Sequence, residues 1–537
     1  MRRYSLPRFL AVGGLIFFLY CLLASLSSSS DQEHPRPNSR PFDVKKWCPL
    51  PAVHSNPDDG LEHSSQLESS DSLKLQIERL SAAVNVPTIN FQDNGRVGED
   101  ERWKVFAQFH IVLERLFPLV HEHAELEKIN TYGLLYTFQG SDRNAKPILF
   151  MAHQDVVPPG STAKWTQHPF QGHYDGKFLW GRGSADCKNT LIGLLSVMEH
   201  LLSQSWSLKR TVIFSFGFDG ETTGLQGAWH LSAHLEKRYG KDSIAMILDE
   251  GGMGIETMGN YAYALPAVTE KGCMDIMLKL EVPGGHSSRP PAHSGIGVMA
   301  EMIVELEKHP YKPRLTQRNP YRGVLECQVR YTPNDVESWL KRDLISGSSE
   351  QLLGMRLSES RGNGARFSLQ TSQAIDIIKA GEKSNQLPDE VNLLINYRIA
   401  PHDGIGSVKQ KIVELVAPIA RKYRLGIQGF GFEEEKTDEG LLILNSRDGA
   451  EPAPIAPRSF DNAVWELFSG TIRQVFEDTE HFKGKTVVPV GDIMNGKQVF
   501  RYDIPHAEAT IPSCTSINVQ YSAIKPACNG ISTRYIQ

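Results

Sequence analysis

The stretch FSFGFDGETTGLQGAWHL, Phe214 to Leu231, decides the fold. It opens with an apolar run of the kind that forms a buried strand. Two acidic residues, Asp219 and Glu221, follow the run directly, on either side of Gly220. A helix is expected to start a few residues later, at about Gly224. The stretch therefore predicts a strand, an acidic turn and a helix in succession, which is the repeating unit of an α/β domain.

Neighbouring stretches repeat this arrangement. Residues 146–152 form a short apolar run that ends at His153, and residues 244–248 form another that ends at Asp249. Between these runs, Asp186 comes shortly before NTLIGLLSVMEHLL, whose apolar residues have helical spacing. Because apolar strands alternate with helical patterns, we expect an α/β fold with a mostly parallel central sheet.

Acidic and imidazole side chains stand at or just beyond the ends of these segments. Ligands of parallel α/β sheets gather beyond the carboxyl ends of the strands, so we predict a metal site formed by His153, Asp186, Glu221 and Asp249. One imidazole among carboxylates suits zinc better than calcium. Asp155 could hydrogen-bond the imidazole and fix its tautomer. Taken singly, each residue is also explained as a polar strand end or a helix cap, but four in series favour a metal site.

The sequence resembles the co-catalytic zinc metallopeptidases, a family that includes aminoacylase, bacterial glutamate carboxypeptidase and the fungal vacuolar Gly-Xaa carboxypeptidase. The resemblance covers about residues 72–502 and is strongest to the vacuolar carboxypeptidase branch. In chain order, the matching stretches are MAHQDVVP, WGRGSADCKNTLIGLL, FGFDGETTGLQGAWHL, ILDEGG, TEKG, PGGHSSRPP and SNQLPDEVNLLINYRIAP. The resemblance implies a catalytic domain at 72–269 and 430–537, with an inserted α+β lid and dimerisation domain at 270–429.

The resemblance also assigns metal ligands. It implies that Asp186 bridges two zinc ions, that His153 and Asp249 complete one site, and that Glu221 binds the second ion. Asp155, beside the ligating imidazole, would belong to the catalytic centre.

Further implied roles fall on the lid. His286 would reach a catalytic centre, often that of a partner subunit, and stabilise the oxyanion. Asn385 and Arg398 would hold the substrate, with the Arg398 guanidinium on the C-terminal carboxylate. The implied substrate is a small peptide or an N-acyl amino acid, and the implied assembly is a homodimer formed through the lid.

Two positions depart from the family pattern. The family has a glutamate, the general base, directly before the zinc-binding glutamate, and here that residue is Gly220. The family's last zinc ligand is a histidine, and Thr515 stands at the matching position. His506 and Cys514 could bind zinc by their chemistry, but neither is at the expected position. The second zinc site is therefore expected to be weak.

These departures bear on activity, because a positioned general base contributes about 10²–10⁴-fold in rate. We expect a zinc metallocarboxypeptidase that cleaves small peptides of the Gly-Xaa type with impaired activity. The alternative is a catalytically inactive homologue that binds peptides or a protein partner. A third explanation is a mis-spliced or altered reading frame over residues 491–537.

The N-terminal part has a different composition. MRRYSLPR precedes an uncharged apolar run at residues 9–26, which favours a single-pass membrane anchor with a cytosolic N-terminus; a cleaved signal peptide is the alternative. Residues 27–71 are rich in Ser, Pro, Asp and His and predict a flexible stem. Either explanation of the apolar run predicts that the protein resides in a vacuole or the secretory lumen.

Overall charge and cysteine content limit the partners. The formal net charge is −5, and no long basic run suggests a nucleic-acid partner. Of the seven cysteines, Cys273 and Cys327 could pair in an oxidising compartment.

Overall fold

The computed structural model describes residues 43–54, 61, 69–222, 224–250, 255–479 and 482–494. The chain divides into two units, residues 1–44 and 45–537, and the architecture below belongs to the second. Thr515, where the family has its last metal ligand, lies outside the described residues, as do His506, Cys514 and the apolar run 9–26.

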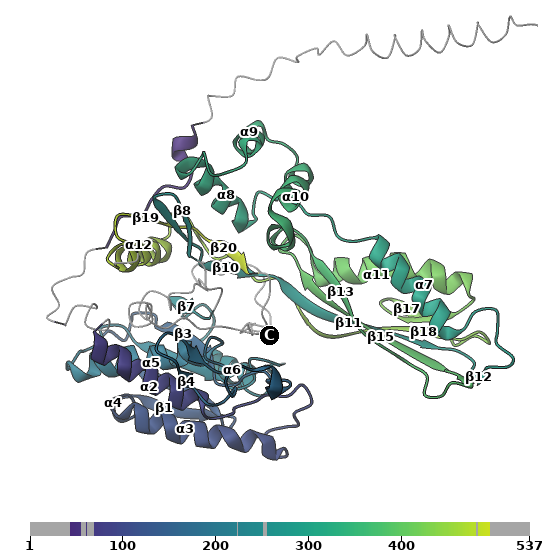
Figure 1. Cartoon of the computed structure of the whole chain (residues 1–537), viewed down its shortest axis with the longest axis horizontal. Coiled ribbons are helices and arrows are strands. Elements are labelled where there is room, and N and C mark those ends of the chain that lie inside the picture. Colours follow the sequence, from purple (N-terminus) through teal and green to yellow (C-terminus); the bar gives the residue numbers. More distant parts are fainter. Residues whose placement is uncertain are drawn as a thin grey trace, which may run out of the picture. The chain divides into compact units, whose positions relative to one another are not determined.

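The central sheet has five strands in the order β1-β2-β6-β3-β7; Figure 1 labels β1, β3 and β7 of this sheet. Strands β6, β3 and β7 are parallel neighbours, whereas β2 pairs antiparallel with both β6 and β1. The expected α/β class is confirmed. The three parallel strands β3, β6 and β7 are the ones that lead to the predicted ligands His153, Glu221 and Asp249. The strands are β1 (Glu125–Ile129), β2 (Gly133–Phe138), β3 (Ile148–His153), β6 (Val212–Gly217) and β7 (Met246–Leu248).

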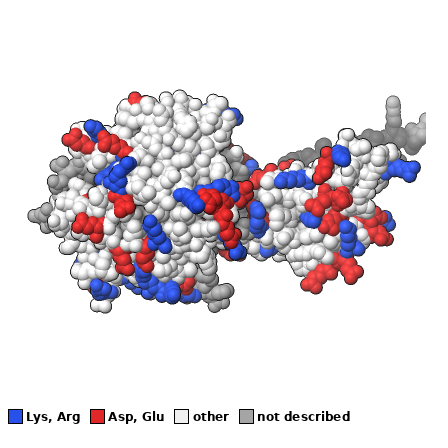
Figure 2. Space-filling view, turned by 90° about the horizontal axis from the view of Figure 1, so that it is seen from below, with Lys and Arg blue, Asp and Glu red and all other residues white. Residues whose placement is uncertain are grey.

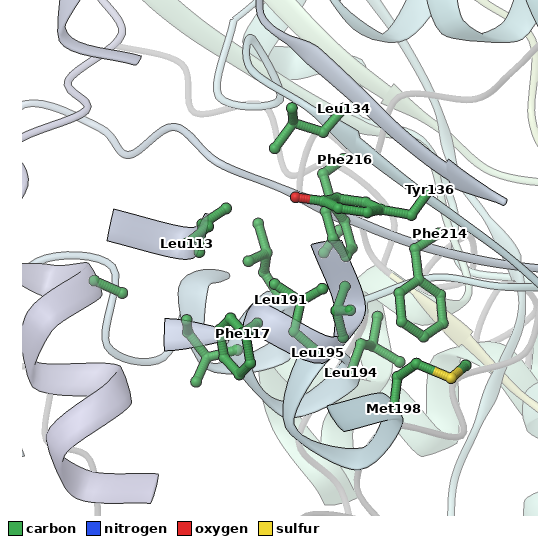
Figure 3. Close-up of a cluster of buried hydrophobic side chains, with 14 of the residues drawn as sticks. Leu113, Phe117, Leu134, Tyr136, Leu191, Leu194, Leu195, Met198, Phe214 and Phe216 are labelled. Atoms are coloured by element: carbon green, nitrogen blue, oxygen red, sulfur yellow. The ribbon is translucent and has the colours of Figure 1, made fainter. Parts of the chain in front are cut away.

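Helices cover both faces of this sheet. Because successive side chains of a strand point to opposite faces, Tyr136, Phe214 and Phe216 contribute to one hydrophobic core and Leu135 and Ile213 to another. Figure 3 shows the first of these cores. Each large side chain buried there stabilises the fold by about 1.5–3 kcal/mol. The helices that contribute to the first core are α2 (Ser70–Val84), α3 (Val105–Leu116), α4 (Pro118–His123) and α5 (Lys188–Ser203), and α6 (Ala228–Tyr239) contributes to the second.

A second sheet has six strands in the order β13-β15-β11-β18-β16-β17. Along β11 every second residue is buried, and α7 (Gly295–Lys308) and α11 (Ile405–Lys422) cover that apolar face (Figure 1). Because β18 pairs with β11, this sheet includes residues beyond 429; the predicted domain boundaries stay predictions. Its strands are β11 (Gly272–Glu281), β13 (Ser372–Ala380), β15 (Glu390–Ile399), β16 (Gly426–Gly429), β17 (Phe432–Glu433) and β18 (Leu441–Ala450).

Shorter elements complete the described chain. Helix α12 (Ala463–Glu477) packs Trp465 and Phe468 against a three-stranded sheet of order β19-β9-β8. Helix α8 (Pro320–Tyr331) packs Val324 against Tyr263 of β9. The remaining elements are β4 (His173–Tyr174), β5 (Leu179–Trp180), β8 (Ile255–Met258), β9 (Tyr261–Ala264), β10 (Ala267–Glu270), β12 (Gly285–His286), α9 (Ser338–Ser346), α10 (Glu350–Ser368), β14 (Gln386–Leu387), β19 (Thr486–Pro489), β20 (Asp492–Met494), and 3₁₀ turns at Val44–Lys46, Glu101–Lys104 and Thr162–Lys164.

The disulfide differs from the expected one. Cys327 of α8 bonds Cys48, with the two Cα atoms 5.1 Å apart, and Cys273 is free. The pairing of Cys273 with Cys327 is therefore wrong: Cys273 belongs to β11 of the six-stranded sheet, whereas Cys327 lies on a helix that packs beside Cys48. Tyr331 also donates a hydrogen bond of 2.7 Å to the carbonyl oxygen of Cys48, which fixes this part of the predicted stem.

The helices of the described residues contradict the predicted membrane-anchored location. A bilayer-spanning helix needs about 20 predominantly apolar residues, and within the ranges given above no helix is long and apolar enough to cross a membrane. The long helices α10 and α11 carry charged residues throughout. The single-pass anchored location is therefore withdrawn, and the run at 9–26 on which it rested lies outside the described residues. On the face seen in Figure 2, positive and negative side chains are interspersed.

Candidate metal and active site

Three parallel strands end side by side at one edge of the central sheet. Strand β3 ends at His153, which pairs in register with Gly217, the last residue of β6. The acidic turn 219–221 comes next after β6, and the Asp249-Glu250 pair follows β7. The carboxyl ends of parallel strands meet at one edge, which explains why residues far apart in sequence gather here.

The His153 imidazole lies between acidic groups on both sides. Its Nδ1 atom is 2.9 Å from the carbonyl oxygen and 3.1 Å from Oδ1 of Asp155. Its Nε2 atom is 3.3 Å from Oδ1 of Asp186 and 3.3 Å from Oε1 of Glu250. Since Nδ1 faces only acceptors here, we assign a proton to Nδ1, which makes Nε2, between Asp186 and Glu250, the nitrogen that could bind a metal ion.

Asp155 links the imidazole to the acidic turn. Its two carboxylate oxygens accept hydrogen bonds of 2.9 Å from the backbone N–H groups of Gly220 and Glu221, and Asn90 donates a third of 3.0 Å. Burial alone would raise the pKa of Asp155, but His153 and these donors lower the pKa below its usual value. Asp155 is therefore an anion that holds His153 and the turn in place.

The residues at this edge fit a divalent metal ion. One ligand atom from each of His153, Asp186, Cys187 and Glu250 lies within 4.8 Å of the others. Ligands at about 2.0–2.1 Å from a tetrahedral zinc ion are about 3.4 Å apart, close to the 3.3 Å separations around Nε2. Three of these residues are buried and the fourth, Glu250, is half-buried, and a cation would offset their concentrated negative charge.

The pKa values reflect the same crowding of acids. Burial, and then the neighbouring acids, raise the pKa of Glu221 to about 7 even though His153 opposes the shift. Burial and Glu250 raise the pKa of Asp249 to about 7. For His153, burial lowers the pKa, but Cys187, Glu250 and Asp155 outweigh burial and bring it well above the usual value.

The cluster includes two residues that sequence reasoning missed. Glu250, next to the predicted Asp249, supplies a carboxylate oxygen 3.3 Å from Nε2, as close as that of Asp186. The adjacent acidic pair after β7 was the available signal. Cys187 directly follows Asp186 and had no separate signal. Asp249, the residue before Glu250, is also buried. The roles of Asp249 and Glu221 as metal ligands stay predictions.

Within the acidic turn 219–221, Asp219 has a structural role, whereas Gly220 has no side chain to contribute. Asp219 accepts hydrogen bonds from the backbone N–H groups of Gln226 at 2.6 Å and Ala228 at 3.1 Å, so it caps the start of α6. Gly220 has no side chain to offer, and a Cβ atom built there would lie 2.6 Å from Cγ of His153. The turn therefore positions its neighbours but provides no base at residue 220.

The predicted lid residues lie in other sheets. His286 is the end of β12, which pairs with β14, and Asn385 accepts a hydrogen bond from the Ser287 N–H at 3.2 Å. The structure thus brings His286 and Asn385 together. Arg398 lies on β15 opposite Cys273 of β11. His286 is not among the residues of the cluster around His153.

Comparison with known proteins identifies the family. A profile described as Peptidase family M20/M25/M40 matches residues 149–504. Carboxypeptidase S of Saccharomyces cerevisiae is 38% identical over 75% of this chain and 71% of its own length. Human "N-fatty-acyl-amino acid synthase/hydrolase PM20D1" is 30% identical over 75% of this chain and 74% of its own.

A solved structure supports the fold. The di-peptidase Dug1p from Saccharomyces cerevisiae superposes with a TM-score of 0.54 at 14% identity, covering 81% of this chain and 86% of that one. The family match spans the strand ends and the cluster described above, and the similarity to carboxypeptidase S extends over most of both chains. This chain therefore belongs to peptidase family M20/M25/M40.

Proposed function

We propose that this chain is a zinc metallocarboxypeptidase that removes C-terminal residues from small peptides of the Gly-Xaa type, with turnover slowed by Gly220. The observation that carries the proposal is the convergence of His153, Asp186 and Glu250 at the ends of parallel strands in a chain of this family. Carboxypeptidase S among the relatives supports the choice of reaction.

His153, Asp186 and Glu250 would hold the zinc ion, with Asp249 and Glu221 as further candidates. When bound, zinc supplies Lewis acidity, which polarises a carbonyl group and acidifies water. Asp155 keeps the His153 proton on Nδ1, so that Nε2 stays available as a ligand. The hydrogen bonds from Gly220 and Glu221 to Asp155 keep the acidic turn against this edge.

Arg398 is the proposed partner of the substrate's terminal carboxylate. Among the described residues, no hydrogen-bond acceptor or ion-pair partner contacts its guanidinium group. The buried Lys271 lies close by: burial, and then the charge of Arg398, lower the pKa of Lys271 to about 8. The Lys271 ammonium already donates to the carbonyl oxygens of Phe367 and Gln370. An unpaired guanidinium beside a second cation favours binding of an anion.

His286 is proposed to stabilise the oxyanion, with Asn385 as a substrate contact. The His286 ring is exposed, and its Nδ1 lies 2.8 Å from the Ser288 hydroxyl. That contact leaves Nε2 available to donate a hydrogen bond to developing negative charge. That His286 acts in the catalytic centre of a partner subunit, in a homodimer formed through residues 270–429, stays a prediction.

Gly220 accounts for the slow turnover in this proposal. A positioned general base contributes about 10²–10⁴-fold, and Gly220 lacks the carboxylate needed to take a proton from water. The same glycine favours a second candidate function, a catalytically inactive homologue that binds peptides or a protein partner. An N-acyl amino acid is the other substrate class to test, since the name of the human relative refers to such compounds.

The experiment measures free leucine released from Gly-Leu and from N-acetyl-leucine by the zinc-loaded full chain. We expect slow release that a chelator abolishes and that Glu250→Gln reduces. Arg398→Ala should raise KM by about tenfold or more, because it removes a charge-assisted hydrogen bond. Binding of Gly-Leu without any zinc-dependent release would contradict the carboxypeptidase proposal and support the inactive homologue.

A further inference from the structure

The thiol of Cys187 lies within the cluster that is proposed to hold the metal. Cys187 sits between Asp186 and the first residue of α5, and only 1% of it is exposed. Its Sγ atom belongs to the set of four ligand atoms that lie within 4.8 Å of one another. The thiol therefore lies within 4.8 Å of a ring nitrogen of His153 and of a carboxylate oxygen of Glu250.

The contacts of Sγ suit a metal-bound thiolate. The backbone N–H of His153 donates a hydrogen bond to Sγ at 3.1 Å, and such a donor stabilises negative charge on sulfur. The opposite contact, from the thiol to the carbonyl oxygen of His153, is longer at 3.6 Å. Loss of the thiol proton would thus give up the weaker of the two hydrogen bonds.

We propose that Cys187 is a fourth protein ligand, so that this chain binds one zinc ion through a nitrogen, a sulfur and two carboxylate oxygens. This inference rests on the metal site of the proposed function and deepens it. Mixed nitrogen, sulfur and oxygen sets suit zinc. A fourth protein ligand would leave less room for water at the metal, which would add to the slow turnover proposed above.

Binding through Cys187 has a defined proton balance. The zinc–sulfur bond forms as the S–H bond breaks, and the proton leaves to solvent or buffer. No electron is transferred. The simpler alternative is that the Cys187 thiol only packs beneath the His153 backbone and keeps its proton when the metal binds.

Cobalt(II) distinguishes these alternatives, because a thiolate bound to cobalt(II) absorbs in the near ultraviolet by charge transfer and a bound carboxylate or imidazole does not. The apo full chain is titrated with cobalt(II) under conditions that leave the Cys48–Cys327 disulfide intact. The matched control is Cys273→Ser, which removes the other free cysteine of the described residues. Cys514→Ser is a second control, since Cys514 was considered as a ligand from the sequence.

We expect the charge-transfer band in the wild type and in both controls, and its loss in Cys187→Ser, with cobalt affinity lower by about 10–100-fold. A band that persists in Cys187→Ser would overturn the inference, and so would cobalt binding by the wild type without a band. The latter result would leave the proposed function standing, whereas absence of any metal binding would overturn both.

X-ray absorption of the zinc-loaded wild type gives a test that needs no variant. One sulfur neighbour at about 2.3 Å is expected. A first shell of nitrogen and oxygen alone would contradict ligation by Cys187, even if Cys187→Ser failed to fold.

Discussion

The imidazole of His153 occupies space that any side chain at residue 220 would need. A Cβ atom on Gly220 would lie 2.6 Å from Cγ and 2.8 Å from Cδ2 of His153, closer than unbonded carbon atoms approach. The lost general base and the position of the metal ligand are therefore linked through one residue. A carboxylate cannot be restored at 220 without shifting His153.

This contact predicts that Gly220→Ala weakens metal binding. The methyl group should displace the His153 ring and lower zinc affinity by about 10–100-fold, the range seen when support of a ligand is lost. Competition with a zinc-sensitive dye measures the affinity. Gly217→Ala is the matched control, because a Cβ atom there meets nothing closer than 3.9 Å. Equal affinity of Gly220→Ala and the wild type would show that the ring does not depend on this space.

A second prediction separates the two adjacent acids after β7. Glu250→Gln should reduce the zinc bound per chain more than Asp249→Asn, because Glu250 supplies the oxygen 3.3 Å from Nε2 of His153. Metal analysis after dialysis against limiting zinc measures the difference. A larger loss in Asp249→Asn would instead assign the ligand role to Asp249, as the family resemblance implied.

The sequence predicted the strand ends, because local pattern determines where a strand stops, whereas the ligand roles stay predictions. Apolar runs that end in His153 and in Asp249 define strand ends, and parallel strands bring those ends together. The choice between Asp249 and Glu250 depends on the backbone path after β7, which no periodicity describes. The antiparallel edge formed by β1 and β2 was likewise absent from the pattern.

Long-range pairings were also beyond the sequence. Cys48 and Cys327 are 279 residues apart, and only the packing of α8 beside the predicted stem brings them together. At Gly220 the sequence alone showed the departure from the family pattern. Only the fold shows that a side chain at this position would collide with His153.

The third prediction concerns this disulfide. Cys327→Ser should lower the free energy of unfolding by about 2–4 kcal/mol, because the crosslink restrains the unfolded chain over a long loop. Urea denaturation of the oxidised proteins measures the change, with Cys273→Ser as the control for loss of a cysteine that forms no disulfide. A reducing agent should remove the difference between the wild type and Cys327→Ser. A difference that survives reduction would point to a packing defect instead.

The fourth prediction concerns acid stability. Arg361 donates hydrogen bonds of 2.9 and 2.8 Å to the two carboxylate oxygens of Glu337, and this contact lowers the pKa of Glu337 from 4.5 to about 2. The stability from the lowered pKa is present above pH 4.5 and is lost as the pH falls through about 2.

After allowance for solvent screening, this ion pair is worth about 1–2 kcal/mol. Glu337→Gln should therefore lose less stability than the wild type when urea denaturation at pH 3 is compared with pH 6. Glu359→Gln, at an exposed position of α10, is the control and should follow the wild type. Identical pH dependence in Glu337→Gln and the wild type would mean that this pair contributes nothing.

The most direct test of the central claim, that a peptidase site is retained without its general base, is the rate of Gly-Leu hydrolysis per bound zinc ion in the wild type and in Gly220→Glu. Dividing by bound zinc removes the effect of the His153 contact on affinity, and Gly220→Ala, which makes the same contact without a carboxylate, is the reference for Gly220→Glu. The account predicts that Gly220→Glu is faster per zinc ion than Gly220→Ala by about 10²–10⁴-fold, the contribution of a positioned base, and faster than the wild type. Equal rates per zinc ion in Gly220→Ala and Gly220→Glu would contradict it.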